Sequence, residues 1–291
     1  MGLAGYIRGG RSGVRASRRN RGKTAFVFAG GGVLGAIQVG HLEALFDAGI
    51  FPDLLVGASV GGLNAAAVAA DPTPAGVERL KEIWSGLRSE DIFPGSSLRR
   101  AWHYVRADHL YPNTGVRALI ERLGVKNFEE LNVPLSVVAA NLRTGAERWF
   151  DTGPIAPALL ASTALPGIFP PVPIDGEPYV DGGVVNNVPI SRAVELGATR
   201  IYILSCGAIR SGDRPMRRPL DVLMTAVVHS RSVRFEQDLT RYAANAEIHS
   251  LPTFDAGVKR FSDPTRSAAL IEQARMRAAE YLAARPAAAS L

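Results

Sequence analysis

The segment that most constrains this chain is 53–67, DLLVGASVGGLNAAA, where an apolar run reaches a serine between two glycines and continues into small, helix-forming residues. This pattern predicts a buried strand, a sharp turn that carries Ser59, and a helix. Gly57 and Gly61 leave the strand and the helix room to pass closely, and the N-terminal end of the helix attracts an anion that forms near the serine. The arrangement suits attack on a carbonyl, although GASVG alone fits a structural turn with an N-capping serine equally well.

A glycine-rich loop comes before this segment in the chain. Residues 24–29, TAFVFA, predict a buried strand, and residues 36–48 carry apolar side chains at helical spacing. The loop between them contains Gly30, Gly31, Gly32 and Gly35. Backbone N–H groups at such a helix N-terminus point at a developing negative oxygen, and the missing side chains of Gly31 and Gly32 let an ester carbonyl approach. We therefore expect this loop to be an oxyanion hole.

The same loop, GGGVLG, also satisfies the GxGxxG pattern of dinucleotide-binding proteins. Those proteins need an acidic side chain at the end of the second strand to bind the ribose hydroxyls. Here Asp53 comes before the second strand, and the residue at the end of that strand is Ser59. Dinucleotide binding is therefore the less favoured use of the loop.

An aspartate followed by two glycines is the third feature. Tyr179 and Val180 lead as a strand into Asp181, Gly182 and Gly183. A carboxylate at a strand end, with bare glycines behind it, is able to approach another loop closely. Taken alone, the tripeptide fits a turn-forming aspartate equally well.

Strands and helices alternate along the chain, which predicts one α/β domain over residues 24–285, with a mostly parallel central sheet sandwiched by helices. Further strands are expected at 135–140, 147–150, 200–205 and 246–251. Further helices are expected at 76–87, 115–123, 157–163, 191–197, 220–242 and 264–285. The proline-rich apolar stretch 164–172 predicts irregular backbone, and residues 286–291 predict a frayed tail.

The positive charge of the chain is concentrated at its amino-terminal end. Residues 1–23 carry seven basic and no acidic side chains, and removing these seven charges from the net +6 leaves −1 for the remainder. A nearly neutral body argues against nucleic-acid binding. We expect residues 1–23 to be a disordered arm, with contact to anionic lipid headgroups as the functional alternative.

Segment 92–111 interleaves aromatic side chains with arginines, which suits a lid or a membrane-interface patch; a cap helix packed on its own domain is the alternative. No apolar run is long enough to cross a membrane, and an export signal built on Ser17-Arg18-Arg19 would remove the glycine loop on cleavage. We therefore expect a cytoplasmic protein with, at most, peripheral membrane contact.

Cys206 is the single cysteine, which excludes an intrachain disulfide and a cysteine zinc cluster, and its apolar neighbours predict a buried thiol.

The glycine loop, the serine turn and DGG occur together far more rarely than any one of them does in a chain with 30 glycines. In this order they resemble the patatin-like phospholipases, the serine–aspartate lipid acyl hydrolases, and ASTALPGIFPPV and DGGVVNNVPI are similar to segments of bacterial members. The resemblance covers residues 24–205 well and the carboxy-terminal helices loosely. It implies a three-layer α/β/α fold in which Ser59 is the nucleophile, Asp181 is its partner in a catalytic dyad, and the loop Gly30–Gly35 forms the oxyanion hole.

A dyad departs from the serine hydrolases that place a histidine between the serine and the acid. His229 and His249 follow Asp181 in the chain, but one lies in an expected helix and the other in an expected strand. We expect structural roles for both. His41 lies too close in sequence to the glycine loop to reach Ser59.

An aspartate with a pKa of about 3.9 is a weak base, so the dyad needs help from burial of the carboxyl and from strong oxyanion donors. We expect an ester to acylate Ser59 and a water activated by Asp181 to release the acid, with no metal or cofactor. The expected substrate is a lipid ester. Phospholipase, lysophospholipase and simple esterase action stay open, as do the oligomeric state and a catalytically silent lipid-binding role.

Overall fold

The computed structural model describes residues 22–94, 107–207, 219–255 and 266–284. The expected amino-terminal arm, apart from its last two residues, and the expected tail 286–291 lie outside these ranges. Residues 95–106 of the aromatic and basic segment lie outside them as well. Within the described ranges, no helix combines the length and the hydropathy needed to cross a membrane.

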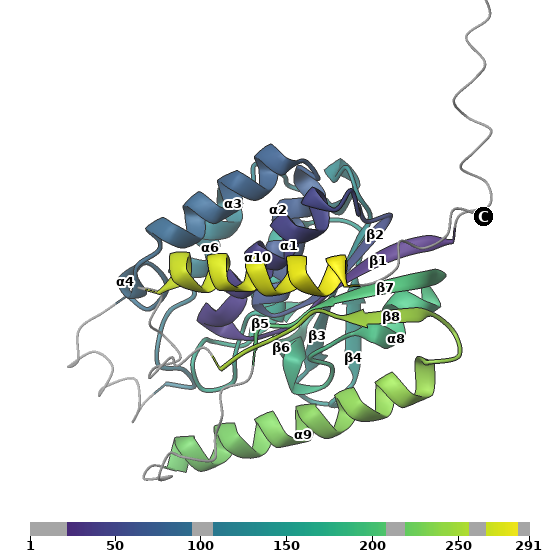
Figure 1. Cartoon of the computed structure of the whole chain (residues 1–291). Helices are drawn as coiled ribbons and strands as arrows, with labels where there is room; N and C mark the ends of the chain where they lie inside the picture. The colour runs from purple at the N-terminus through teal and green to yellow at the C-terminus, as the bar shows by residue number, and fades with distance from the viewer. Residues whose placement is uncertain (1–21, 95–106, 208–218, 256–265, 285–291) are drawn as a thin grey trace, which may run out of the picture.

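The described strands form one sheet of eight, in the order β5-β6-β3-β2-β1-β7-β8, with β4 paired to β3 (Figure 1). Their bounds are β1 Lys23–Phe28, β2 Leu54–Ala58, β3 Leu135–Asn141, β4 Glu147–Phe150, β5 Val172–Ile174, β6 Glu177–Asp181, β7 Ala198–Leu204 and β8 Glu247–Ser250. β1 pairs in parallel with β2 and β7, β2 with β3, and β7 with β8. β4 and β6 run antiparallel to β3, and β5 runs antiparallel to β6. The mostly parallel sheet expected from the sequence is confirmed.

Helices cover both faces of this sheet (Figure 1). Their bounds are α1 Ala36–Asp47, α2 Val60–Ala70, α3 Pro74–Gly86, α4 Ser89–Ile92, α6 Thr114–Glu121, α7 Ile155–Ser162, α8 Ile190–Glu195, α9 Pro219–Tyr242 and α10 Ser267–Ala283; three short 3-10 helices are η2 Gly32–Gly35, η3 Phe128–Glu130 and η4 Gly182–Val184. The larger apolar cluster joins the sheet to α1, α2, α3, α7 and α10, and a smaller one joins the opposite face to α8 and α9. The three-layer α/β/α arrangement is therefore confirmed.

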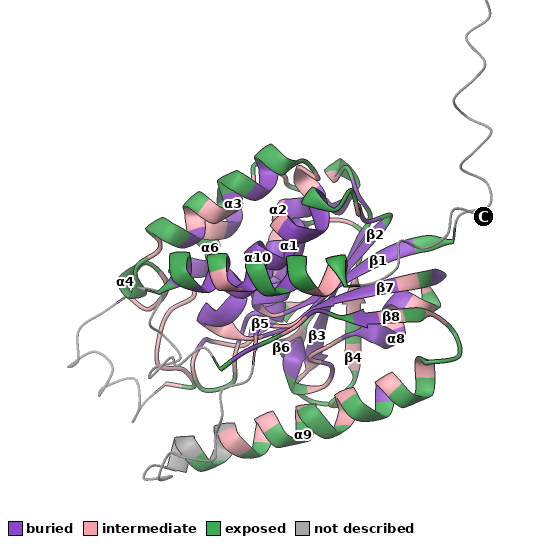
Figure 2. Ribbon diagram, in the orientation of Figure 1, coloured by how far each residue is buried: buried purple, intermediate pink, exposed green. Residues whose placement is uncertain are grey.

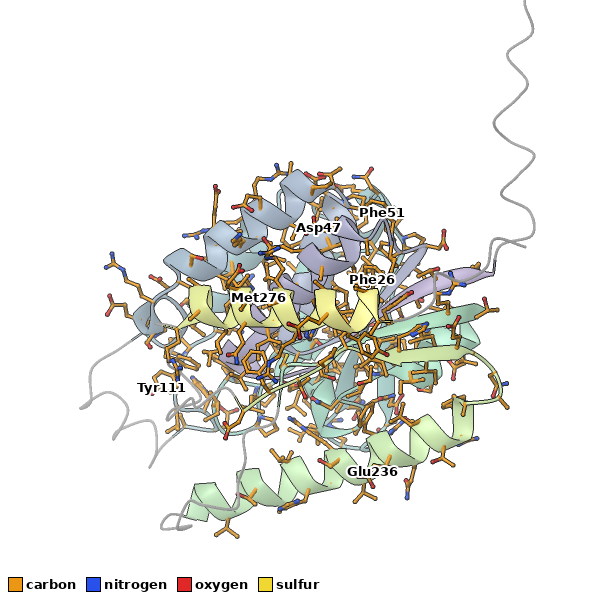
Figure 3. All side chains as sticks on the ribbon, in the orientation of Figure 1. Phe26, Asp47, Phe51, Tyr111, Glu236 and Met276 are labelled. Carbon is orange, nitrogen blue, oxygen red and sulfur yellow. The ribbon has the colours of Figure 1, made fainter. Side chains whose placement is uncertain are left out.

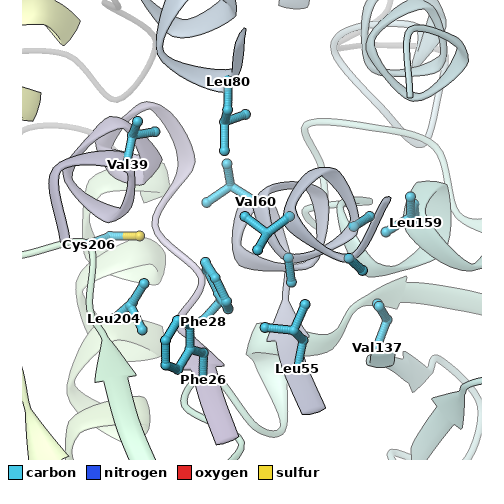
Figure 4. Packing of buried hydrophobic residues seen from close by; sticks show 14 of the residues in the cluster. Phe26, Phe28, Val39, Leu55, Val60, Leu80, Val137, Leu159, Leu204 and Cys206 are labelled. Atoms are coloured by element: carbon cyan, nitrogen blue, oxygen red, sulfur yellow. The ribbon is translucent and has the colours of Figure 1, made fainter. Parts of the chain in front are cut away.

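The central strands are buried on both sides, as Figure 2 shows for the middle of the molecule. In β1, Phe26 and Phe28 face the larger cluster while Ala25 and Val27 face the smaller one, and all four are fully buried. Figure 4 shows Phe26 and Phe28 packed in the larger cluster, with the Cys206 side chain near Leu204. A strand covered on both faces needs a continuous apolar run, which explains TAFVF.

The strands β2 and β6 end against neighbouring residues of β3. Ala58, the last residue of β2, pairs with Val138, and Asp181, the last residue of β6, pairs with Ala139. β4 pairs with both of these β3 residues as well, and since a strand residue has only two sides, β2 and β6 share one edge of β3. Their carboxyl ends therefore meet, one coming from each direction.

Some element boundaries differ from the sequence prediction. Stretch 164–172 was expected to be irregular throughout, but Val172 begins the short strand β5. The single proline of β5, Pro173, and that of β6, Pro178, lie in an edge hairpin where a missing N–H is tolerated. The helix expected at 76–87 begins two residues earlier, because Thr73 caps it by accepting a hydrogen bond from the Gly76 N–H. The closing helix is described from Ser267 onward.

Candidate active site

Ser59 lies at the junction between β2 and α2. Its backbone has φ 55° and ψ −133°, a left-handed conformation that is uncommon for a residue with a side chain. A Cβ placed on Gly57 would lie 2.7 Å from the Cα of Gly62, and one placed on Gly61 would lie 2.5 Å from the carbonyl oxygen of Phe28. Both contacts are with backbone, so neither glycine has room for a side chain. The turn holds Ser59 at the carboxyl end of the sheet and at the N-terminus of α2.

The Ser59 hydroxyl donates a hydrogen bond of 2.6 Å to Oδ2 of Asp181. The other carboxyl oxygen, Oδ1, accepts a 2.7 Å hydrogen bond from the Gly183 N–H. On the far side of the turn, the Ser59 N–H donates to Oγ of Ser162 over 2.9 Å. The structure thus brings together the serine and the aspartate that the sequence singled out, and both are held by second partners.

Asp181 is 2% exposed. Burial raises the pKa of its carboxyl, and this effect outweighs three that lower it: the positive charge of Arg231, the Ser59 hydroxyl and the Gly183 N–H. A raised pKa makes the carboxylate a stronger base than an aspartate in water. The environment therefore supplies part of what a dyad without histidine requires.

The glycine loop passes directly beside Ser59, since a Cβ placed on Gly30 would lie 3.0 Å from the Ser59 Cβ. The Gly30 N–H is already committed to the carbonyl oxygen of Asn187, at 3.1 Å. Among the described residues, the N–H groups of Gly31 and Gly32 donate to no acceptor, and Gly32 adopts φ 57°, which favours glycine. Gly31 and Gly32 therefore have the N–H groups that are free to bind an oxyanion.

The remaining loop glycine has a packing role. A Cβ placed on Gly35 would lie 2.7 Å from Cγ2 of Val60 and 2.8 Å from the indole ring of Trp84. Gly31 is equally confined from behind, because a Cβ there would lie 2.2 Å from Cβ of Cys206. Cys206 is buried as expected, and its thiol donates to the carbonyl oxygen of Ala29 at 3.3 Å.

A buried polar network that the sequence analysis missed holds both ends of the glycine loop. Gln38 Nε2 donates to the carbonyl oxygens of Ala29 and Leu204, each at 2.8 Å. Asn64 Nδ2 donates to the carbonyl oxygen of Gly35 at 3.0 Å and to Oε1 of Gln38 at 2.8 Å. The signal in the sequence is an amide side chain among the mostly apolar residues of each of two buried helices, α1 and α2.

Trp84 completes this network from α3. Its indole N–H donates to Oδ1 of Asn64 over 2.9 Å. Gln38 and Asn64 are 0% and 2% exposed, so every bond in the network is shielded from water. The backbone before and after the loop is therefore fixed by side chains that never touch the loop's free N–H groups.

Two further residues near the dyad also escaped the sequence analysis. Asn187 exchanges two hydrogen bonds with Gly30, since its carbonyl accepts from the Gly30 N–H and its Nδ2 donates to the Gly30 carbonyl at 3.2 Å. Arg231 reaches the neighbourhood of Asp181 from the middle of α9. Asn187 lies within the segment DGGVVNNVPI, but the sequence does not show that it contacts the glycine loop. Arg231 belongs to no recognisable motif, and its proximity to Asp181 arises only in the fold.

The histidines considered in the sequence lie away from the dyad. His41 is fully buried, its Nε2 is 3.1 Å from the carbonyl oxygen of Pro252, and burial lowers its pKa to about 4. His249 stacks on Tyr202 with ring centroids 4.6 Å apart, and His229 is exposed on α9. These three histidines make no hydrogen bond to Ser59 or Asp181.

The structure offers little support for a nucleotide or a metal. Asp53 lies at the other end of β2 from Ser59, where its Oδ2 accepts from the Thr24 N–H at 2.9 Å. The ribose-binding position of a dinucleotide site thus holds Ser59. Within the described residues, no three histidine, cysteine or acidic side chains come together in a group able to hold a metal ion.

A family model described as "Patatin-like phospholipase" matches residues 26–194, more than half of the chain. "Neuropathy target esterase sws" of Drosophila melanogaster is 27% identical over 191 residues, which are 62% of this chain and 13% of that protein. "Patatin-like phospholipase domain-containing protein ZK370.4" of Caenorhabditis elegans is 32% identical over 189 residues, or 63% of this chain and 13% of that protein. "Lysophospholipase nte1" of Aspergillus terreus is 26% identical over 203 residues, again 13% of its length. The chain thus spans about an eighth of the length of these relatives.

Among solved structures, VipD from Legionella pneumophila aligns with a TM-score of 0.51 at 13% sequence identity. The alignment covers 89% of this chain and 67% of that chain. At this identity the likeness concerns the fold alone.

Proposed function

The chain belongs to the patatin-like phospholipase family, and from this membership and the geometry of the site we propose that it is a lipid acyl hydrolase working through an acyl-enzyme on Ser59. The observation that carries the proposal is the 2.6 Å hydrogen bond from the Ser59 hydroxyl to Asp181. It joins a strained turn to a buried carboxyl, with free backbone N–H groups alongside. A nucleophile, a base and an oxyanion site are the parts that acyl transfer needs.

In the acylation step, Ser59 Oγ attacks the ester carbonyl carbon while its proton passes to Oδ2 of Asp181. The carbonyl oxygen becomes negative and accepts hydrogen bonds from the N–H groups of Gly31 and Gly32, assisted by the N-terminal dipole of α2. When the tetrahedral intermediate collapses, the carbon–oxygen bond to the alcohol breaks and Asp181 returns the proton to the departing oxygen. The products of this step are the alcohol and the acyl-enzyme.

Deacylation repeats these events with water as the nucleophile. Asp181 takes a proton from the water, whose oxygen attacks the acyl carbon, and the same N–H groups bind the second oxyanion. The bond to Ser59 Oγ then breaks, the carboxylic acid leaves, and the proton on Asp181 returns to the serine. No group beyond the side chains and backbone named here takes part.

We propose a lipid ester as the substrate, because two of the relatives are named as a lysophospholipase and an esterase. Peripheral membrane contact through residues 1–23 and 92–111 belongs to the same proposal and rests on their basic and aromatic composition. Liposome sedimentation with and without residues 1–23 tests the arm: equal binding of the two forms contradicts its role. A panel of phospholipids, lysophospholipids and simple esters identifies the substrate class.

A fluorophosphonate probe tests the activated serine directly, since an ordinary serine does not react with it. We expect covalent labelling of the native protein, located at Ser59 by peptide mass spectrometry, and no labelling of Ser59→Ala. Asp181→Asn should label far more slowly. Lipid binding without any labelling would instead support a catalytically silent lipid-binding module.

A further inference from the structure

Two arginines three positions apart on α9 differ sharply in their surroundings. Arg234 is fully engaged: it donates to the Val185 carbonyl at 2.6 Å and forms ion pairs with Glu147 at 2.7 Å and Asp238 at 3.5 Å. In Arg231, Nε and Nη2 are buried and have no hydrogen-bond partner. Leaving two buried guanidinium nitrogens without a partner is costly, so the position of Arg231 calls for an explanation.

The helix places these side chains against the domain. Glu236, on the same helix, is exposed (Figure 3). Arg234 is the anchor that fixes the middle of α9, because it ties the helix both to the backbone after η4 and to β4. Arg231 lies one turn earlier and therefore approaches η4 and the end of β6.

The Arg231 guanidinium, the Asp181 carboxyl and the Asn187 side-chain oxygen all border the space beside Gly183. A Cβ placed on Gly183 would be 3.2 Å from Arg231 Nη2 and 3.0 Å from Asp181 Oδ1. These two atoms are therefore no more than about 6 Å apart, a range over which opposite charges shift each other's ionisation. Among the ion pairs of the described residues none joins Arg231 to Asp181, so the approach stops short of direct contact.

This separation suits the chemistry of the dyad. Both oxygens of Asp181 are already in use, Oδ2 by the Ser59 hydroxyl and Oδ1 by the Gly183 N–H. An arginine in direct contact would compete for one of these oxygens and tie up the lone pair that receives the serine proton. A guanidinium that lies near the carboxylate without touching it stabilises the negative charge and leaves both oxygens with their present hydrogen-bond partners.

No other charge does this work within the described part of the chain. The main elements packed against β6 and η4 are β3, β5 and α7, which carry no charged side chain, and α9. Arg231 is the charged group that acts on Asp181, and Asp181 in turn acts on Arg231. Each is the counter-charge of the other.

We propose that Arg231 is a positioning residue of the active site: its guanidinium keeps the buried Asp181 in the carboxylate form while both carboxyl oxygens stay with Ser59 and Gly183. The inference rests on the proposed function, since it assigns Asp181 the role of base. It adds to the site a residue from α9, a helix beyond the segment matched by the family model.

The first test is the pH profile of Arg231→Gln on a water-soluble ester such as p-nitrophenyl butyrate. A base must be ionised to act, so activity falls as the pH drops through the pKa of Asp181. Burial raises the pKa of Asp181 and the positive charge of Arg231 lowers it, so removing that charge raises the pKa further. We therefore expect the acidic limb of the profile to move up by about one to two pH units. The plateau at high pH should change little, because Asp181 is then ionised in both proteins.

Two variants serve as controls. Arg231→Lys keeps the charge and should keep the limb within about half a pH unit of the parent. Arg241→Gln removes the same charge from the same helix about 15 Å farther along its axis, and it should leave the limb unmoved. A loss of activity in Arg231→Gln that is equal at every pH would overturn the proposal, because it would mark a structural role only.

A second measurement needs no catalysis and so separates this inference from the proposed function. The carboxyl 13C resonance of Asp181, assigned by its disappearance in Asp181→Asn, gives the titration midpoint directly. We expect a higher midpoint in Arg231→Gln than in the parent, whether or not an ester is hydrolysed. An unchanged midpoint in a folded variant would refute the role of Arg231.

Discussion

Ser59 Oγ and Asp181 Oδ2 are 2.6 Å apart although 122 positions separate the residues in the chain. β3 brings them together, because Ala58 and Asp181 pair with its adjacent residues Val138 and Ala139 along one edge. Two strands running in opposite directions thus end at the same point. The register of β3 is therefore as important to the site as the two side chains themselves.

Asp181→Asn should remove activity and still fold. The asparagine has the same shape but is no base, so we expect kcat to fall by at least about a thousandfold, the scale seen when catalytic groups that act as a unit are removed. Esterase assays with thermal unfolding as a folding control measure this. Substantial activity in the variant would remove Asp181 from the mechanism.

The same variant should also show a pH-dependent gain in stability. The pKa of Asp181 is raised in the folded protein, so the folded state binds the proton more tightly than the unfolded state, and stability falls as pH rises through that interval. The net rise already includes the opposing attraction of Arg231. We expect Asp181→Asn to unfold at a higher temperature than the parent at pH 7, and the difference to shrink toward pH 4. A difference that grows on acidification would contradict this sign.

Gly31→Ala should displace the glycine loop that carries the proposed oxyanion donors. The new Cβ would lie 2.2 Å from Cβ of Cys206 and 2.7 Å from its sulfur, so the loop must move. Losing one oxyanion donor costs about a hundredfold to a thousandfold in kcat. We expect a loss of that size, measured as kcat on a soluble ester.

The double variants identify the cause. Cys206→Gly removes both crowding atoms and should restore part of the activity of Gly31→Ala. Cys206→Ala removes the sulfur but keeps the closer Cβ, and it should restore much less. Equal recovery in the two doubles would show that the clash with Cβ is not what moves the loop.

The parts of the site that the sequence predicted are those encoded by short contiguous motifs. The glycines around Ser59 and the N–H groups of Gly31 and Gly32 follow from local backbone requirements, which neighbouring residues reveal. The apolar runs of β1, β2, β3 and β7 predict a buried sheet for the same reason. Asp181 was found because its two glycines mark a strand end.

The parts that were missed depend on side chains meeting across the fold. Arg231 lies on a long, mostly polar helix, where an arginine is ordinarily a solvated residue. The sequence shows Gln38 and Asn64 only as polar residues within mostly apolar helices, because the groups with which they form hydrogen bonds are known only from the fold. β5 was missed because its central residue is a proline, which single-sequence reasoning assigns to irregular backbone.

Ser162→Ala should weaken the support of the strained turn. Ser162 Oγ accepts the Ser59 N–H at 2.9 Å, and the Ser162 side chain is fully buried, so its loss leaves that donor unpaired. An unsatisfied buried donor costs about 1–3 kcal/mol. We expect the free energy of unfolding to fall by that amount and kcat to fall with it, whereas Ser162→Thr, which keeps the hydroxyl, should retain more of both.

Disrupting the Gln38–Asn64–Trp84 network should lower catalysis through the glycine loop, which it holds at both ends. Asn64→Ala leaves the Gly35 carbonyl, Gln38 Oε1 and the Trp84 N–H without their partner, at about 1–3 kcal/mol for each unsatisfied group that water does not reach. Trp84→Phe leaves only Asn64 Oδ1 unpaired and should cost correspondingly less.

A transition-state analogue such as a trifluoromethyl ketone distinguishes loop positioning from general destabilisation. The affinity for the trifluoromethyl ketone should fall more than the affinity for a ground-state amide analogue. Only the ketone adduct carries an oxyanion that uses the N–H groups of Gly31 and Gly32. Equal losses for the two ligands would limit the network to a structural role.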